Sequence, residues 1–240
     1  MNYLITGCSR GVGLEICRVL LKEGHEVYGI ARTYSNEFET LEKTYGKKLH
    51  FKSIDLGNPN EIREAIFKQY IPNSVVLHGY VNNAAIAYDD IVTNLNLDRL
   101  EAMYKVNVFT PMMITKYAIR NMILHHTKGC IIHISSISAH TGYKGLAMYA
   151  SSKGALEAFS KDTAREWGGL GIRSNTVVPG FMETAMSSSL TEEQKNRIYK
   201  RTSLKSATDT NSVAETVAFL LSTKACSITG QNIHVDNGTI

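Results

Sequence analysis

The sequence predicts an α/β fold, namely a single doubly wound domain whose seven-stranded parallel sheet carries helices on both faces. Three observations support this prediction. Short apolar stretches, typical of buried strands, alternate along the chain with longer amphipathic stretches, typical of helices. A glycine-rich turn joins the first strand to the first helix. No repeat, low-complexity stretch or linker interrupts the alternation, so we expect one domain over residues 1–240.

The first part of the chain reads as a strand, a turn, a helix and a second strand, which together form a βαβ unit of about 30 residues. The first strand is expected at 3–6 and the second at 27–31. The helix between them should end at Gly24, because glycine favours helix C-termini.

The turn of this unit, T-G-C-S-R-G-V-G at 6–13, is typical of a dinucleotide site. Gly7 permits a tight turn, while Gly11 and Gly13 allow the backbone to approach a pyrophosphate and the helix to pack on the sheet. The helix N-terminus would face the anion. A purely structural glycine turn is the alternative, but the strand before the turn and the helix after it favour nucleotide binding.

The alternation continues to the C-terminus. Asn58 and Pro59 are typical of the start of a helix. Further strands are expected at 49–54, 75–81, 130–134, 172–178 and 232–235, and helices at 58–70, 98–103, 107–126, from 149 onward, 191–200 and 211–222.

Composition restricts the class of protein. The chain is 43% apolar and 20% charged, as in globular proteins, and its net charge of +4 comes from dispersed basic residues, which does not indicate nucleic-acid binding. No apolar run approaches the ~18 residues of a membrane span, and we expect a cytoplasmic protein with no membrane partner. The four cysteines lie far apart without a C-x-x-C pair, which predicts free thiols and no metal site.

The stretch from Gly129 to Lys153 contains candidate catalytic residues. A predicted buried strand ends at Ser135 and Ser136, and a helix begins near Tyr149. Tyr149 and Lys153 are four residues apart and would share a helix face. An ammonium about 4 Å from the phenolate would supply about 4 kcal/mol, enough to bring the tyrosine pKa from ~10 to near 7. Alone, Y-x-x-x-K is more often a surface pair than a site, so the rest of the chain has to provide the context.

With these motifs in view, the chain resembles the short-chain dehydrogenase/reductase family, which has a Rossmann-type fold, from end to end. Within the family it is most similar to bacterial 3-oxoacyl-[acyl-carrier-protein] reductases. The matching features are the glycine turn, Asp55 after the third strand, N-N-A from Asn82, Asn107, Ser136, Y-x-x-x-K and P-G-x-x-x-T from Pro179 to Thr184.

The resemblance implies a nicotinamide enzyme with four catalytic residues. Tyr149 would protonate the carbonyl oxygen of the substrate, and Ser136 would hydrogen-bond that oxygen. Lys153 would lower the pKa of Tyr149 and hold the nicotinamide ribose. Asn107 would position a water that links Lys153 to solvent.

The cofactor is predicted to be NADP(H). An NAD enzyme of this fold has an acidic residue at the end of the second strand, but here Ala31 is followed by Arg32, and Arg10 lies in the glycine turn. Two guanidiniums fit a 2′-phosphate. The resemblance places the other cofactor contacts at Gly7, Ser9, Gly11, Val12, Gly13, Asp55, Leu56, Asn83, Ala84, Tyr149, Lys153, Pro179, Gly180, Met182 and Thr184.

The implied reaction is reduction of a carbonyl substrate, in particular a 3-oxoacyl thioester on acyl-carrier protein or coenzyme A. An NADP-dependent alcohol, sugar or steroid dehydrogenase is the alternative, and a non-catalytic nucleotide-binding relative is a more remote one. A substrate lid is expected at about 185–210. Its basic residues would attract an acidic carrier, or would form only a solvated helix face; they are Lys195, Arg197, Lys200, Arg201 and Lys205.

The chain departs from the family pattern at several positions. Ala85 stands where N-N-A-G has glycine. Where carrier-protein reductases have arginines, this chain has His126-Thr127 and Leu170.

The substrate pocket is expected to include His140, Tyr143, Met148, Phe181 and Met186. The resemblance also implies a homotetramer that packs through the helices beginning at 107 and 149, with candidate interface residues Met113, Tyr117, Leu156 and Phe159.

Overall fold

Seven strands form one parallel sheet in the order β3-β2-β1-β4-β5-β6-β7, as a computed structural model of the chain shows for residues 1–184 and 190–239. The sheet grows outward from β1 in both directions, so the strand order reverses between β1 and β4. This arrangement confirms the predicted fold class. The strands are β1 (Asn2–Thr6), β2 (Glu26–Ala31), β3 (Leu49–Ser53), β4 (Gly79–Asn82), β5 (Cys130–Ile134), β6 (Arg173–Pro179) and β7 (Asn232–Val235).

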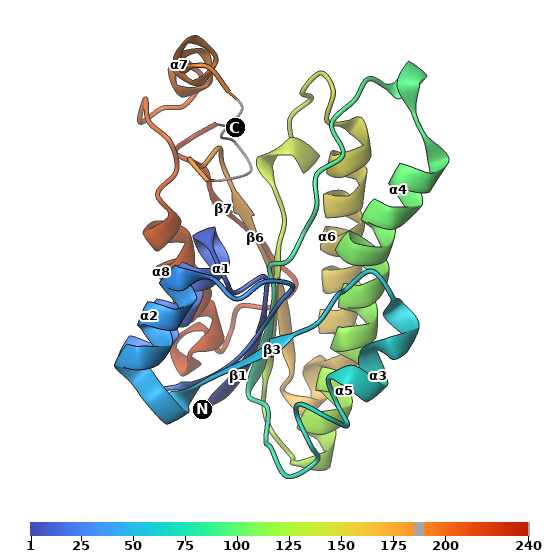
Figure 1. Cartoon of the computed structure of the whole chain (residues 1–240), viewed down its shortest axis with the longest axis vertical. Coiled ribbons are helices and arrows are strands. Elements are labelled where there is room, and N and C mark those ends of the chain that lie inside the picture. The colour runs from blue at the N-terminus through green and yellow to red at the C-terminus, as the bar shows by residue number, and fades with distance from the viewer. Residues whose placement is uncertain (185–189, 240) are drawn as a thin grey trace.

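Helices cover both faces of the sheet (Figure 1). On one face lie α1 (Gly11–Lys22), α2 (Asn36–Tyr45) and α8 (Thr210–Leu221). On the other lie α3 (Ile62–Ala65), α4 (Leu97–Tyr104), α5 (Thr110–Leu124) and α6 (Ala147–Trp167). A shorter helix, α7 (Glu192–Lys200), lies beyond the carboxyl ends of the strands. In the part of the chain that the structure describes, no helix is long and apolar enough to cross a bilayer.

Each face of the sheet has its own apolar core. Because side chains of a strand alternate between the two faces, neighbouring residues enter different cores. This explains why the strands read as continuous apolar runs. The pairs that divide in this way include Leu4 and Ile5 in β1, Tyr80 and Val81 in β4, and Ile131 and Ile132 in β5.

The predicted strand at 75–81 forms only from Gly79 onward. The Asn121 side chain of α5 takes the hydrogen bonds that a strand partner would make before this point. Its Oδ1 accepts from the Leu77 amide at 2.9 Å, and its Nδ2 donates to the Val75 carbonyl at 2.9 Å. The segment before β4 is therefore held by a helix side chain instead of a neighbouring strand.

Two of the predicted helices also differ from the structure. The helix predicted at 58–70 is broken into a 3₁₀ turn (Pro59–Glu61), the short α3 and further turns. Asn107 does not begin a helix, because it lies in a π-helical turn (Lys105–Phe109) that joins α4 to α5. A π-turn inserts an extra residue into the helix, and such turns are common at functional sites.

Helix α2 is absent from the sequence-based prediction. Ser35 caps its N-terminus, and its hydroxyl accepts from the Phe38 amide at 3.1 Å. Only Phe38 and Leu41 of this helix are buried. Its apolar periodicity is therefore weak, and the serine cap was the one clear signal.

We expect the variant Asn121→Ala to lower the free energy of unfolding by about 2 kcal/mol, because it leaves the buried Leu77 amide without a partner. Urea denaturation at fixed protein concentration measures this change. Lys116→Ala, at an exposed position of the same helix, is the control and should stay within about 0.5 kcal/mol of wild type. Equal stability of the two variants would contradict the assigned role of Asn121.

Candidate active site

An open cleft of about 490 Å³ lies at the carboxyl ends of the central strands, where the strand order reverses. Ligands of doubly wound sheets bind at such a point. Every residue predicted to contact the cofactor lines this cleft except Gly13. Ser136, Tyr149 and Lys153 also line it, whereas Asn107 does not.

The glycine turn after β1 is tightly packed. Gly7 has φ +68°, and a methyl group on it would lie 2.8 Å from Asn83 Nδ2. A methyl group at Gly13 would lie 2.1 Å from the Gly7 carbonyl oxygen. Gly13 therefore acts by letting α1 pack against the turn, which explains why it does not face the cleft.

The N-terminus of α1 faces the cleft without a side-chain cap. Its N-cap residue is Arg10, whose side chain makes no capping hydrogen bond. The free amides of a helix N-terminus bind anions such as a pyrophosphate. A methyl group on Gly11, which has φ +56°, would meet only Thr184 Cγ2, at 3.9 Å, so there is room above the turn. These residues fit the phosphates of a dinucleotide.

The end of β4 supports the turn from below. Asn83 Nδ2 donates to the carbonyl oxygens of Thr6 at 3.1 Å and Gly7 at 3.0 Å. The Thr6 hydroxyl in turn accepts from the amides of Asn83 and Ala84, both at 3.2 Å. The N-N-A motif thus holds the turn in place across the junction of β1 and β4.

Helix α6 brings Tyr149 and Lys153 to the cleft. Lys153 is buried, with 2% of its surface exposed, and its Nζ donates to the Ile134 carbonyl at 2.8 Å. The same atom lies 5.6 Å from the centroid of the Tyr149 ring. Burial lowers the pKa of Lys153 to about 8.

The pKa of Tyr149 moves opposite to the sequence-based expectation. Burial, followed by the Asp89 carboxylate, raises it to about 12, although a hydrogen bond with Ser136 lowers it. The expectation assumed that the Lys153 ammonium would dominate, but removing the phenolate from water has the largest effect on this pKa. Tyr149 therefore keeps its proton at neutral pH, as a proton donor must.

Ser136 lies at the start of a 3₁₀ turn (Ile137–Ala139) that follows β5. Its Oγ accepts from the Ser138 amide at 3.2 Å and from the Ser138 hydroxyl at 3.0 Å. Because a hydroxyl that accepts two hydrogen bonds still has its own proton to give, Ser136 can donate into the cleft.

Asn107 connects three segments behind the cleft. Its Oδ1 accepts from the Ile86 amide at 2.9 Å, and its Nδ2 donates to the Ile86 carbonyl at 2.9 Å and to Ser152 Oγ at 3.1 Å. The side chain is 1% exposed. It thus joins the π-turn, the loop after β4 and α6. The role implied for it, holding a water, stays a prediction.

The predicted lid is described only in part. Residues 185–189, which include Met186, lie outside the described residues. Helix α7 follows and contacts the segment after β6: the rings of Phe181 and Tyr199 are 6.0 Å apart, and Lys195 Nζ is 3.6 Å from Glu183. Lys195 also pairs with Glu192, and Arg197 with Glu193, so part of the basic charge of the lid is neutralised.

Several residues predicted for the substrate pocket or the interface lie elsewhere. Met148 packs in a small core with Tyr88 and Met103. Leu156 is 0% exposed, so it cannot be an interface residue. His140 turns away from the cleft lining and contacts Glu157 at 3.0 Å.

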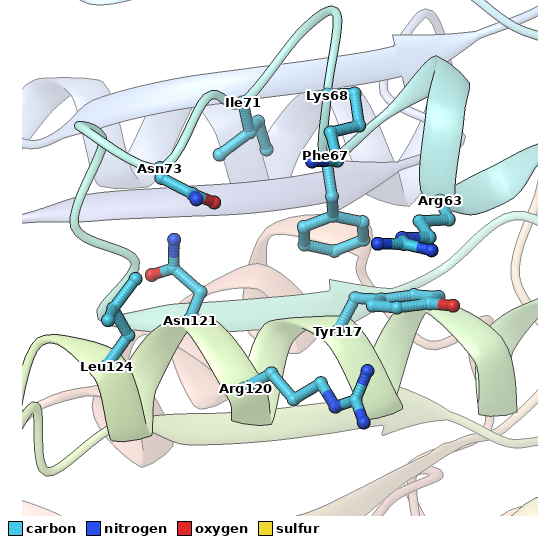
Figure 2. A pocket seen from close by; sticks show the side chains of 9 residues that line it. All are labelled: Arg63, Phe67, Lys68, Ile71, Asn73, Tyr117, Arg120, Asn121 and Leu124. Atoms are coloured by element: carbon cyan, nitrogen blue, oxygen red, sulfur yellow. The ribbon is translucent and has the colours of Figure 1, made fainter.

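Tyr117 lines a second, smaller pocket of about 180 Å³ between the segment around α3 and helix α5 (Figure 2). Its ring packs against Phe67, with centroids 5.4 Å apart. Arg63 and Arg120 flank the same ring. Tyr117 is thus partly buried within its own subunit, and none of the residues predicted for catalysis or cofactor binding lines this pocket.

The cleft also contains residues that the sequence analysis missed. Most directly flank predicted ones at strand ends, so strand-end position was the available signal. Asp89, which raises the pKa of Tyr149, gave no signal because it acts through space. The missed lining residues are Ala31, Thr33, Ile54, Ala85, Ile86, Ala87, Val106, Ile134 and Ser135.

Comparison with known proteins places this geometry in context. Residues 7–239 match the family model described as enoyl-(acyl carrier protein) reductase. The chain is 32% identical over 239 residues to L-xylulose reductase of Caenorhabditis elegans, covering 99% of this chain and 94% of the relative. It is 31% identical over 235 residues to 3-oxoacyl-[acyl-carrier-protein] reductase FabG of Vibrio cholerae, covering 98% and 95%.

The solved structures that resemble this fold are also described as dehydrogenases and reductases. A 4-hydroxyisoleucine dehydrogenase complexed with NADH superposes with a TM-score of 0.92 at 25% identity, covering 99% of this chain and 98% of that one. A protein described as a putative betaketoacyl-ACP reductase gives a TM-score of 0.86 at 26% identity, covering 99% and 97%.

We expect Tyr149→Phe to lower kcat for carbonyl reduction by about 100-fold or more, because the variant has no proton to transfer. Binding of NADPH, measured by fluorescence titration, should stay near the wild-type value. Tyr104→Phe is the matched control, since that hydroxyl donates to Ser151 Oγ at 2.9 Å and Tyr104 does not line the cleft. A Tyr149→Phe variant that keeps a tenth of the wild-type kcat would exclude this residue as the proton donor.

Proposed function

The chain belongs to the short-chain dehydrogenase/reductase family and is an oxidoreductase acting on CH–OH and C=O groups; on this basis we propose that it reduces a 3-oxoacyl thioester to the 3-hydroxyacyl product with NADPH. One observation carries the proposal of a reductase. Ser136, Tyr149 and Lys153 line the same cleft as the glycine turn, and the raised pKa of Tyr149 supports its role as proton donor. This set can bind a nicotinamide cofactor and give a proton to a carbonyl oxygen.

The cofactor would be held by the glycine turn, the end of β4 and the segment from Pro179 to Thr184, and when bound it would supply the hydride. The residues of the chain supply the proton and stabilise the charge that its transfer leaves. Tyr149 gives its hydroxyl proton to the carbonyl oxygen, while Ser136 donates a hydrogen bond to that oxygen as negative charge develops on it. Lys153, with a pKa of about 8, is mainly protonated at neutral pH, and its charge stabilises the phenolate that forms.

The proposed cofactor is NADP(H). Arg10 and Arg32 line the nucleotide end of the cleft, and both are exposed. No carboxylate stands at the end of β2, where Ala31 is followed by Arg32 and Thr33. An arginine pair suits the 2′-phosphate of NADP(H), whereas an acidic residue would suit the 2′-hydroxyl of NAD.

We expect Arg32→Ala to weaken NADPH binding by about 10- to 100-fold, which corresponds to the loss of one charge-assisted hydrogen bond to phosphate. NADH binding should change little, because its ribose carries no phosphate. Titration of both cofactors on the same preparation gives the ratio. Arg18→Ala, which removes an arginine paired with Glu15 outside the cleft, should affect neither cofactor. An equal loss for NADPH and NADH in Arg32→Ala would contradict the proposed phosphate site.

A 3-oxoacyl thioester is the favoured substrate because the similarity to 3-oxoacyl-[acyl-carrier-protein] reductases covers almost the whole chain. The L-xylulose reductase of C. elegans is similar to the same degree. A sugar or alcohol substrate is therefore the second candidate. The positions expected to hold carrier-binding arginines remain His126-Thr127 and Leu170, which favours coenzyme A or a free acyl group over a docked carrier.

The substrate proposal is tested by NADPH oxidation with a panel of acetoacetyl-coenzyme A, acetoacetyl-carrier protein, ethyl acetoacetate, L-xylulose and a 3-oxosteroid. We expect turnover of the acetoacetyl compounds. If the cationic residues of α7 attract an acidic carrier, added salt should raise KM more for the carrier-bound substrate than for ethyl acetoacetate. Turnover of L-xylulose or the steroid without any acetoacetyl compound would establish the second candidate instead.

Two further proposals concern the oligomeric state and the cellular location of the enzyme. We infer a homotetramer, which is supported by exposed apolar side chains on and beside α5, namely Phe109, Ile123 and Leu124. With Leu156 excluded, the remaining partly exposed candidates on the two helices are Met113, Tyr117 and Phe159. A cytoplasmic location is proposed on the similarity to carrier-protein reductases.

A further inference from the structure

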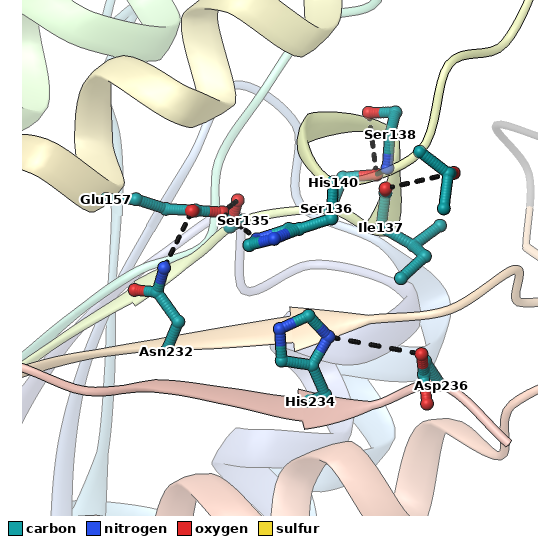
Figure 3. A network of polar contacts seen from close by, with 10 residues as sticks. Ser135, Ser136, Ile137, Ser138, His140, Glu157, Asn232, His234 and Asp236 are labelled. Atoms are coloured by element: carbon teal, nitrogen blue, oxygen red, sulfur yellow. Dashed lines mark hydrogen bonds and ion pairs between the residues drawn. The ribbon is translucent and has the colours of Figure 1, made fainter. Parts of the chain in front are cut away.

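We propose that Glu157 is a positioning residue that fixes Ser136 against Tyr149 by clamping both ends of the segment that carries the serine. The inference uses the role of Ser136 in the proposed reduction, but it does not depend on which carbonyl compound is the substrate. Figure 3 shows the Glu157 carboxylate between α6 and the segment that follows β5.

Three donors meet at this carboxylate, two from the segment that follows β5 and one from β7. Oε1 accepts from the Ser135 hydroxyl and from His140 Nε2, the latter at 3.0 Å. Oε2 accepts from Asn232 Nδ2 of β7 at 2.7 Å. Glu157 is only 8% exposed. Hydrogen bonds to a buried carboxylate are short and strong, and together they satisfy a charge that would be costly to leave alone.

We call the contacts of Glu157 with Ser135, His140 and Asn232 the clamp. Two of its donors lie at the two ends of the segment that carries Ser136. Ser135 immediately precedes Ser136, and His140 ends the 3₁₀ turn that follows it. Holding both ends of residues 135–140 fixes the one short turn that carries Ser136.

The acceptor lies on the helix that carries the other two groups. Tyr149, Lys153 and Glu157 are successive residues at spacing four on α6, so they share one face. Glu157 therefore sets the distance between the turn that carries Ser136 and Tyr149, whose pKa Ser136 lowers. A displacement of about 1 Å between reacting groups can lower a rate by about 100-fold.

The first pair of variants separates hydrogen bonding from charge. Glu157→Leu removes both acceptor oxygens and with them all three hydrogen bonds. Glu157→Gln keeps an oxygen for Ser135 and His140 and presents an amide to Asn232. The Oδ1 of Asn232 is buried and has no hydrogen-bond partner among the described residues, so a flip of its amide lets it accept from the new side chain. We expect kcat to fall about 10- to 100-fold in Glu157→Leu and less than about 3-fold in Glu157→Gln, with KM and the NADPH dissociation constant near wild type in both.

A second pair tests the contact to β7 by exchange. Asn232→Asp alone would set two carboxylates against each other where a donor now lies 2.7 Å from Glu157, so its kcat should fall. The double variant Glu157→Gln/Asn232→Asp restores one donor and one acceptor, and its kcat should return to within about 3-fold of wild type.

A general loss of stability is excluded by a control on the same helix. Ser160→Ala removes a buried hydrogen bond of 2.8 Å to Ser174 on β6, which does not touch the clamp. It should lower the melting temperature but leave kcat unchanged. A fall of kcat in Ser160→Ala that matches the fall in Glu157→Leu would overturn the proposal, because stability alone would then explain both.

Amide hydrogen exchange of the enzyme without substrate gives a readout that does not require turnover. Exchange at 135–140 should speed up in Glu157→Leu, stay near wild type in Glu157→Gln, and not change at 160–165. Kinetics are measured with whichever carbonyl compound the wild-type enzyme reduces, so a wrong substrate proposal is visible in the wild type and does not affect this test. Unchanged exchange at 135–140 in a folded Glu157→Leu, or faster exchange with wild-type kcat, would overturn the proposed clamp.

Discussion

The buried hydrogen bond from Lys153 to the carbonyl of Ile134 is the contact on which the site depends. It joins α6 to the carboxyl end of β5 at 2.8 Å, directly before the serines of the candidate site. A buried ammonium needs an acceptor, and here the acceptor is a backbone oxygen whose position the sheet fixes. This bond holds the ammonium against one face of the Tyr149 ring, 5.6 Å from its centroid.

The charge balance around this lysine explains the acid–base properties of the cleft. His133, on the same strand, is buried, and burial together with Lys153 lowers its pKa to about 3. The histidine is therefore neutral at physiological pH and adds no second positive charge. Tyr149 remains protonated in the same environment. Tyr149 is thus set to give a proton, and the phenolate becomes favourable only when charge around it changes during the reaction.

The sequence predicted those parts of the site that depend on local spacing. The glycine turn and the Tyr149–Lys153 pair were recognisable because each lies within one turn or one helix face. The supporting contacts were not, because their partners are distant in sequence: Asn107 contacts Ser152, 45 residues away, and Glu157 contacts Asn232, 75 residues away. The shift of the Tyr149 pKa was misjudged for a related reason, since a motif carries no information on burial.

The uncapped N-terminus of α1 has a consequence for the folding equilibrium of the whole domain. A Ser, Thr, Asp or Asn side chain at the N-cap position stabilises a helix by roughly 1 kcal/mol through a hydrogen bond to a backbone amide. Arg10, the N-cap residue of α1, makes no such bond. A dinucleotide bound at the glycine turn would take the place of the missing cap, and ligand concentration and stability would then be linked. At a cofactor concentration about 100 times its dissociation constant, mass action adds about 2.7 kcal/mol to the folded state. A cell rich in the cofactor would thus hold more of this protein in its folded form than one depleted of it.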